Sequence, residues 1–432
     1  MNIKHIIAAS ALVALSVNSF GQNVNKLIKR ADVERIIKTL SADDMQGRGT
    51  FTPGIEKAAT FIANEFKQIG LTPLTGNKGY LQSFSLNRST PLKATVNING
   101  TELSPDSAFV AAGASFTWDS NSGAEVAKIA AGANFREEYF KYIESGKKMI
   151  IVVDTSFHAI FKRIKQRSSD GQLVAKGSEK QALVFVLGKY DEVKNYTVTY
   201  ESKTEELPLA NVVGVLKGKT KPKEFVIFSG HYDHLGIIKP MDGDSIANGA
   251  DDDASGTTAV ISLARYYKKL NNNARTLIFV AFTAEEIGGY GSRHFSEKVD
   301  PEKTVAMFNI EMIGKASKFG TNSAFITGYE RSNFGTILQK NLKGTVFQFH
   351  PDPYPEQELF YRSDNATLAR LGVPAHSIST DQIDSDKLYH TVKDEFSSLD
   401  AGNITSTIRA IALSSRTIVS GKDTPTRIAK EK

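Results

Sequence analysis

The alternation of apolar runs with helically spaced segments is the main pattern of the C-terminal half of the chain. Helical spacing of apolar residues recurs near residues 255–269, 331–342 and 401–419. Between these segments lie six strand candidates: Val212–Leu216, Phe225–Phe228, Thr276–Phe282, Val305–Ile310, Ser323–Ile326 and Ala375–Ser379. Strands that alternate with helices in this way predict a three-layer α/β domain.

The N-terminal segment also has a helical pattern of apolar residues. A stretch of short strands and turns separates it from the α/β half. Residues 31–70 are predicted to be helical, with Ile55 and Phe66 among the spaced apolar positions and Gly70 as a C-cap. From about residue 92 to 207, short strands and turns replace this pattern. We therefore expect a main domain made of residues 22–90 and 208–421, an inserted β-rich domain at 91–207 and a short tail at 422–432.

Residues 1–21 have the composition of a secretory signal peptide. Lys4 gives a basic start, residues 6–17 form a short apolar stretch, and small residues lie near a cleavage point expected after Gly21. The apolar stretch is too short for a membrane span and no later stretch is longer, so we expect no stable membrane insertion. The mature chain is expected in the periplasm or outside the cell.

Composition narrows the chemistry that the chain can perform. None of its 432 residues is cysteine, which excludes disulfides, thiolate zinc sites and cysteine nucleophiles. Any metal ion must therefore be bound by His, Asp or Glu. The net charge of +6 is small for this length and the Lys and Arg residues are scattered, so the sequence gives little reason to expect a nucleic-acid partner.

Imidazoles and carboxylates follow the apolar runs. Open α/β sheets bind ligands at the carboxyl ends of their strands, so side chains that collect there are placed for chemistry. Five of them have the donor atoms that zinc accepts: His231, Asp252, Glu286, Glu311 and His390. Five ligands are enough for two zinc ions if one carboxylate bridges them.

Each of these residues has an ordinary explanation when it is taken alone. A histidine at a strand end is more often a core or surface residue, an Asp triplet at 251–253 could cap the helix that follows, and a glutamate pair in a loop is usually solvated. Their common position at strand ends favours a metal site. Asp233 suits a group that orients the imidazole of His231. The role of His234 is left open, and the histidines outside the motifs are interpreted as structural: His158, His294, His350 and His376.

The adjacent residues Glu285 and Glu286 are predicted to have different roles. Consecutive side chains diverge, so one can bind a metal ion while the other faces the metal-bound water. Zinc lowers the pKa of its water to about 7, and a neighbouring carboxylate can take the proton and pass it to a leaving amine. We therefore expect hydrolysis by a zinc-bound hydroxide.

The motifs of the C-terminal half closely resemble those of the co-catalytic di-zinc exopeptidases, the family that includes bacterial leucyl aminopeptidases, aminopeptidase Y and glutamate carboxypeptidase II. They occur in the family's order: GHYDHLG at 230–236, GADDDASG at 249–256, TAEEIGG at 283–289, NIEMIG at 309–314 and YHT at 389–391. The resemblance covers roughly residues 208–400, and LSADDMQGRGT at 40–50 is similar to the family's N-terminal segment. It implies the zinc-exopeptidase αβα fold with a mixed central sheet. In position and texture, the insert at 91–207 resembles the protease-associated domain of many members.

The resemblance also implies roles for single residues. His231 and Glu311 would bind the first zinc, and Glu286 and His390 the second. Asp252 would bridge the two ions. Glu285 would be the general base. Tyr389 resembles the tyrosine that polarises the substrate carbonyl in some members, and a packing role for it stays open. The peptide bond between Asp252 and Asp253 is expected to be cis, as in many members.

The sequence departs from the family pattern at two positions. Glu311 stands where aminopeptidases of the family usually have Asp, which leaves its coordination mode open. Asn365 stands where relatives often have His, although its segment is still expected to line the substrate pocket. Nearby, Arg362 could bind a substrate carboxylate or pair with an acid of the chain.

The function that these patterns favour is that of an exported zinc aminopeptidase acting on peptides. A carboxypeptidase of the same fold and a glutaminyl cyclase are the alternatives. Retention of both His231 and Glu311 argues against the cyclase, which works with one zinc. The complete set of five ligands argues against a non-catalytic, receptor-like module. The preferred residue and the oligomeric state do not follow from the sequence.

Overall fold

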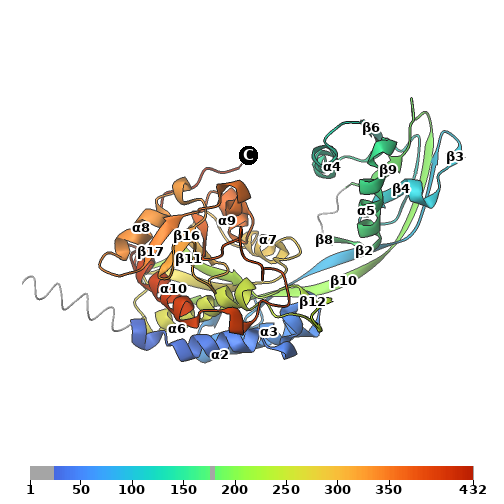
Figure 1. Cartoon of the computed structure of the whole chain (residues 1–432). Helices are drawn as coiled ribbons and strands as arrows, with labels where there is room; N and C mark the ends of the chain where they lie inside the picture. Colours follow the sequence, from blue (N-terminus) through green and yellow to red (C-terminus); the bar gives the residue numbers. More distant parts are fainter. Residues whose placement is uncertain (1–23, 176–180, 432) are drawn as a thin grey trace, which may run out of the picture. The chain divides into compact units, whose positions relative to one another are not determined.

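The computed structural model describes residues 24–175 and 181–431 (Figure 1). The predicted signal peptide lies outside the described residues. The chain forms two compact units. Unit 1 contains the chain up to Ser83 and again from Leu209, and unit 2 contains Phe84–Pro208.

Unit 1 is built on a mixed sheet. The strand order is β17 (Gln348–Pro351), β16 (Ser323–Ile326), β18 (Ala375–Ser379), β15 (Thr304–Ile310), β11 (Lys221–His231), β14 (Arg275–Phe282) and β10 (Tyr196–Leu216), the last of which begins in unit 2. Strand β11 is parallel to β14 and β15, and β15 is parallel to β18. Strands β10 and β16 run antiparallel to β14 and β18. The predicted mixed central sheet is thus confirmed.

The central strands are apolar because both faces of the sheet are covered. All eight residues of β14 are buried. The ring of Phe228 on β11 stacks between Phe279 and Phe308 of the neighbouring strands, with centroid distances of 5.5 and 4.8 Å. Continuous apolar runs of this kind are typical of parallel strands with helices on both sides.

Two layers of helices cover the sheet. One apolar core joins the sheet to α2 (Arg30–Leu40), α3 (Pro53–Ile69), α6 (Gly256–Leu270), α8 (Phe334–Asn341), α10 (Ala401–Ser414) and α11 (Arg416–Val419). A second core on the opposite face joins it to α7 (Tyr290–Ser296) and α9 (Asn365–Arg370). In Figure 1, α2 and α3 lie in blue along the side of unit 1 that also contains α6. The three-layer αβα fold predicted for the main domain is confirmed.

The predicted helical segment at 31–70 is interrupted in the structure. Between α2 and α3 lies a tight turn, η1 (Asp43–Arg48), in which Gln46 and Gly47 have φ values of 52° and 61°. A continuous helix cannot contain residues in this left-handed conformation. The expectation of one helical stretch is therefore wrong at this turn, and the turn brings Arg48 into the interior.

Unit 2 combines strands with two helices. Its four-stranded sheet has the order β4 (Ala108–Ala111), β9 (Leu183–Leu187), β7 (Met149–Val153) and β6 (Glu125–Ile129). The two helices are α4 (Phe135–Glu144) and α5 (His158–Ser169). Further strands are β2 (Leu81–Ile98), β3 (Thr101–Glu102), β5 (Phe116–Asp119) and β8 (Gln172–Ala175). The likeness of this unit to a protease-associated domain stays a prediction.

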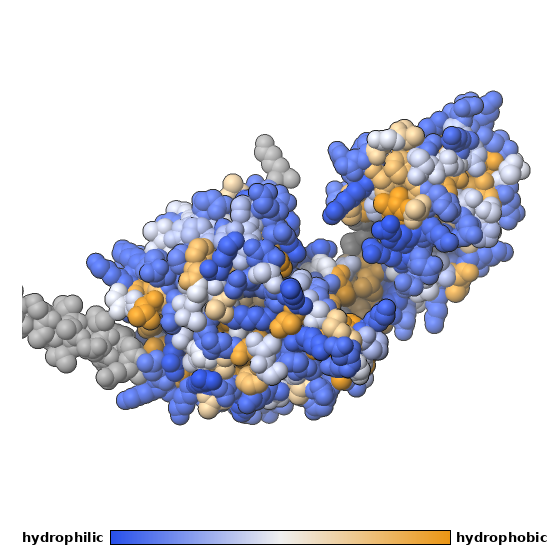
Figure 2. All heavy atoms as spheres, in the orientation of Figure 1, coloured by the Kyte–Doolittle hydropathy of each residue, from blue (hydrophilic) through white to orange (hydrophobic). Residues whose placement is uncertain are grey.

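The surface of unit 1 seen in Figure 2 is mostly hydrophilic, with small and separate hydrophobic areas. In the part of the chain that the structure describes, every helix is too short or too polar to span a bilayer.

Candidate metal centre and active site

The parallel strands deliver three of the predicted ligands to one edge of the sheet. Strand β11 ends at His231, Glu286 follows the end of β14, and Glu311 follows the last residue of β15. Since these strands are parallel, their carboxyl ends lie at the same edge. Asp252 comes from η4 (Ala250–Ser255), the segment before α6, and His390 from the loop after β18.

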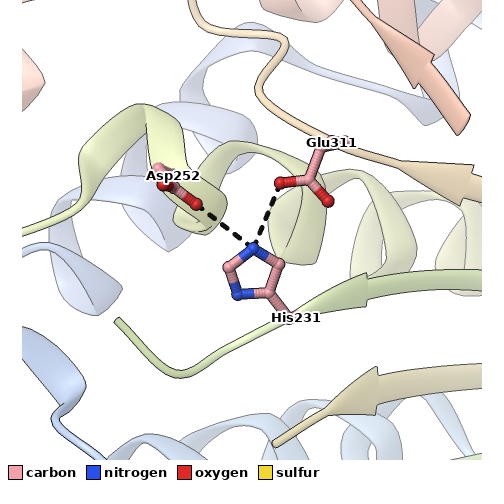
Figure 3. A group of neighbouring side chains, drawn as sticks. All are labelled: His231, Asp252 and Glu311. Atoms are coloured by element: carbon pink, nitrogen blue, oxygen red, sulfur yellow. Dashed lines mark hydrogen bonds and ion pairs between the residues drawn. The ribbon is translucent and has the colours of Figure 1, made fainter. Parts of the chain in front are cut away.

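Figure 3 shows the first cluster, in which Asp252 and Glu311 both point at the ring of His231. Nε2 of His231 lies 3.1 Å from Oδ1 of Asp252 and 3.1 Å from Oε1 of Glu311. The other oxygen of Glu311 accepts a hydrogen bond of 2.6 Å from the Ser363 hydroxyl. This hydrogen bond orients the long side chain of Glu311 and leaves its Oε1 to bind a metal ion.

The second cluster shares Asp252 with the first. Nε2 of His390 lies 3.2 Å from Oδ2 of Asp252 and 3.2 Å from Oε2 of Glu286. Asp252 is buried and presents one carboxylate oxygen to each cluster. All five predicted ligands are thus brought together at one place.

The spacing of these atoms fits zinc. Two ligand atoms at about 2.0 Å from a tetrahedral zinc ion lie roughly 3.3 Å apart. The four nitrogen–oxygen distances of 3.1 and 3.2 Å are close to this value. The donor set, with imidazole nitrogen and carboxylate oxygen, is also one that zinc accepts.

The structure shows a contact of His234, whose role the sequence left open, with the second cluster. Its Nδ1 lies 2.7 Å from Oε1 of Glu286, the oxygen that does not face His390. This distance is that of a charge-assisted hydrogen bond and is shorter than the separation of two ligands on one ion. The buried His234 therefore donates a hydrogen bond to Glu286. The position of a second imidazole in the motif HYDH was the only signal for this contact in the sequence.

Asp233 supports the turn that carries the glutamate pair. Its carboxylate accepts hydrogen bonds from the backbone N–H groups of Glu285 and Glu286, at 3.1 and 3.2 Å. The carboxylate lies 3.7 Å from Nδ1 of His231, whereas the backbone oxygen of Asp233 is only 3.1 Å from that nitrogen. The imidazole is therefore oriented by the main chain of Asp233, and the side chain orients the loop after β14.

The three aspartates of the DDD triplet have different roles. Asp252 points into the clusters, while Asp253 accepts from the N–H of Gly256 at the start of α6 and from that of His231. The capping explanation is thus correct for Asp253. The N–H groups of Asp251 and Asp252 donate to the carboxylate of Asp394. The peptide bond between Asp252 and Asp253 is cis, as expected.

Arg48, for which the sequence predicted no role, contacts the backbone of this loop. It is fully buried, and its guanidinium donates to five backbone oxygens: those of Leu40, Tyr232, Asn248, Gly249 and Asp252. Two of these carbonyls belong to Asp252 itself and to the residue after His231. Through Arg48, the LSADDMQGRGT segment thereby contacts the backbone next to two predicted ligands, at Tyr232 and at Asp252.

Glu285 lines the pocket beside the first cluster and is half-buried. Burial raises its pKa well above the ordinary value, and the carboxylates of Glu311 and Asp364 add to this shift. Asp364 itself is fully buried, and burial raises its pKa to about 7. A carboxyl group with a raised pKa exchanges protons more readily near neutral pH, which is what a general base and acid must do.

A pocket opens next to both clusters. Its apolar wall consists of Met312, Phe325, Leu359 and Ile383. Tyr389 lines the pocket and stacks on the ring of His390 at a centroid distance of 3.8 Å. Burial raises the pKa of Tyr389, so the phenol keeps its proton at neutral pH and can donate a hydrogen bond.

Asn365 and Arg362 of the RSDN segment have different surroundings. Asn365 is buried, and its amide donates to the backbone oxygens of Phe360 and Ala375, so it holds the local fold. Arg362 lines the pocket, and its Nη1 lies 3.4 Å from the backbone oxygen of Gln357. No carboxylate among the described residues forms an ion pair with it.

The segment that contains this site matches a known protein family. Residues 211–414 match the model of Peptidase family M28. This segment is a peptidase family M28 domain. It includes all five clustered ligands and the Glu285 position. The resemblance to the co-catalytic zinc exopeptidases is confirmed.

Two solved structures share the fold of this chain. An aminopeptidase from Aneurinibacillus sp. strain AM-1 is 18% identical, with a TM-score of 0.56, and the match covers 95% of this chain and 98% of that one. A zinc aminopeptidase from Bacillus subtilis is 16% identical, with a TM-score of 0.55 and coverage of 91% and 95%.

Curated sequences match over a shorter segment. A probable zinc metalloprotease of Pyrenophora teres f. teres (strain 0-1) is 34% identical over 110 residues, which are 25% of this chain and 23% of that protein. Aminopeptidase YwaD of Bacillus subtilis (strain 168) is 32% identical over 122 residues, or 26% and 24% of the two chains. The chain thus spans about a quarter of the length of these relatives.

Proposed function

We propose that the chain is a zinc-dependent aminopeptidase that binds two Zn²⁺ ions and removes N-terminal residues from peptides. The observation that carries this proposal is the carboxylate of Asp252, which offers one oxygen to each of two clusters. His231 and Glu311 would hold the first ion, and Glu286 and His390 the second. Bound zinc would supply Lewis acidity and a water of lowered pKa.

The chain's own residues would divide the remaining chemistry. Glu285 would accept a proton from the attacking water and transfer it to the leaving amine. The phenol of Tyr389 would donate a hydrogen bond to the oxygen of the scissile carbonyl. The carboxylate of Glu285, which would bind no zinc, also lines the pocket and could pair with the α-ammonium group of a free N-terminus.

The experiment that tests this proposal combines metal analysis with paired substrates. We expect two zinc ions per chain, loss of activity on dialysis against a chelator, and recovery on addition of Zn²⁺. Dipeptides with a free N-terminus should be cleaved and their N-acetylated counterparts should not. Cleavage of only the blocked peptides would support the carboxypeptidase. A single zinc that does not involve His231 and Glu311 would support the glutaminyl cyclase.

Export of the chain is part of the same proposal and rests on the composition of residues 1–21. Fractionation of cells that express the full chain should find the activity outside the cytoplasm, with a new N-terminus at residue 22. Retention of the uncleaved chain in the cytoplasm would contradict it.

A further inference from the structure

The pocket beside the metal centre contains one acidic side chain that the proposed mechanism does not use. Asp381 follows β18, and its backbone N–H donates to the hydroxyl of Ser379 at 3.1 Å, which fixes the turn. The residue lines the pocket and is only 5% exposed. Its oxygen Oδ1 has no hydrogen-bond partner among the described residues.

No basic residue of the described chain forms an ion pair with this carboxylate. Lys315 is close enough to act on Asp381 electrostatically, but its ammonium group pairs with Asp386 at 2.5 Å and with Asp251 at 3.4 Å. Burial, with the nearby carboxylate of Asp386, raises the pKa of Asp381 to about 7. A buried carboxylate without a partner costs free energy, and a cation that enters the pocket would remove this cost.

The rest of the pocket suits a long aliphatic chain that ends in a charge. Met312, Phe325 and Ile383 offer an apolar wall against which methylene groups can pack. Hydroxyl groups of Thr327, Ser377 and Ser379 also line it and can accept further hydrogen bonds from an ammonium or guanidinium group. The pocket therefore combines an apolar wall with an acidic group.

We infer that Asp381 makes this pocket selective for peptides whose N-terminal residue is lysine or arginine. The inference rests on the proposed aminopeptidase function. The α-ammonium group is bonded to the carbon next to the scissile carbonyl, so it must lie at the metal centre, where Glu285 already provides a carboxylate. Asp381 is then available for the side chain of the same residue.

The test compares lysyl and norleucyl p-nitroanilide, because the norleucine side chain is that of lysine without its ammonium group. The ratio of their kcat/KM values should be at least about 10 in the zinc-loaded protein. In Asp381→Asn the ratio should fall by about 10- to 100-fold, the range expected when a hydrogen bond between charged groups loses its charge. Asp381→Glu, which keeps the carboxylate, should retain the preference for lysine in part.

The matched control is Asp384→Asn. The side chain of Asp384 is 48% exposed and lies 3.4 Å from Lys318 outside the pocket, so the ratio should not change. A wild-type ratio below 1, a preference for acidic residues that disappears in Arg362→Gln, or an unchanged ratio in Asp381→Asn would each overturn the selectivity. If Asp381→Asn does not fold, the wild-type ratio still tests the preference for lysine, and Asp381→Glu tests the part that Asp381 plays in it. If the zinc-loaded protein cleaves no aminoacyl substrate, the proposed function itself fails and the inference falls with it.

Discussion

Glu285 and Glu286 are neighbours in the chain, but their side chains have different surroundings. Glu286 contacts His234 with one oxygen and His390 with the other. Glu285 has a pKa that burial raises, and it lines the pocket. The first arrangement suits a metal ligand and the second a group that exchanges protons.

Substitution of the two glutamates should therefore have different effects. Glu285→Gln should lower kcat by about 10²- to 10⁴-fold, the usual contribution of general acid–base catalysis, while zinc content and thermal stability stay near those of the wild type. Glu286→Gln should lose zinc and regain part of its activity when Zn²⁺ is added. Steady-state kinetics and metal analysis on both variants check this. Loss of metal in Glu285→Gln with full retention in Glu286→Gln would exchange the two roles.

His234 should control the affinity of the second cluster for zinc. In His234→Ala, Oε1 of Glu286 loses its hydrogen-bond donor, and the carboxylate can rotate away from the position in which Oε2 faces His390. We expect zinc affinity to fall by about 10- to 100-fold, as is typical when a group behind a ligand is removed. Competition with a chromogenic chelator measures this. His158→Ala, at an exposed position in unit 2, is the control, and equal affinities of the two variants would contradict the role of His234.

The sequence predicted the residues that meet at the metal centre better than the contacts that hold them. Ligands at strand ends could be found because the chemistry and the topology limit where they occur. The hydrogen bond from His234 to Glu286 could not, since it depends on the irregular backbone that follows β11. The hydrogen bonds from the loop after β14 to the Asp233 carboxylate depend on that same segment.

Sequence patterns also failed to predict short helices and strands. Helices α7 and α9 have seven and six residues, which is less than two full turns, so they contain too few apolar positions to reveal a period. Strand β17 was missed for a different reason, since only one of its four residues is buried. By contrast, the fully buried strand β14 stood out as an apolar run.

The turn η1 should be as important for zinc binding as an element that contains ligands. Arg48→Met would remove the guanidinium that donates to five buried backbone oxygens, among them that of Asp252. The oxygen of Gly249 still accepts from the N–H of Ala254, and each oxygen that is left without a donor costs about 1–3 kcal/mol. We expect a fall of at least about 3 kcal/mol in the free energy of unfolding and a weaker zinc affinity. Urea unfolding and chelator competition measure the two effects.

A suitable control for this element is Arg30→Met. Arg30 pairs with Glu34 on the exposed face of α2, where the loss of an ion pair should cost less than about 1 kcal/mol. Arg48→Lys keeps the charge but reaches fewer of the five oxygens, so its stability should lie between those of the wild type and Arg48→Met. A zinc affinity equal to that of the wild type in Arg48→Met would refute the role of η1.

For the whole molecule, His376 predicts how stability depends on pH. It is buried between the hydroxyl of Ser332 and the backbone oxygen of Thr327, and burial lowers its pKa to about 4 from the ordinary value of 6.5. Above pH 6.5 neither the folded nor the unfolded state protonates it. Between pH 6.5 and 4 only the unfolded state does, so stability falls as the pH falls.

This single group should cost about 2 kcal/mol between pH 7 and pH 5. In His376→Gln, which cannot be protonated in this range, the decrease in the free energy of unfolding over the same interval should be smaller by that amount. Urea unfolding of both proteins at the two pH values and at equal zinc concentration gives the comparison. Parallel pH profiles of the two proteins would show that His376 is protonated in the folded state as easily as in water.

The division of unit 1 into two chain segments has a consequence for synthesis on the ribosome. Helices α2 and α3 bury Ile36, Ile37 and Phe66 in a core whose strands all come after unit 2 in the chain. At the usual rate of translation, their apolar faces stay without a partner for on the order of ten seconds while unit 2 is made. Unit 2 is continuous in sequence and needs no later residue. The middle of the chain is therefore expected to fold first, and the N-terminal helices, although they are made first, can be placed only when the last strands have emerged.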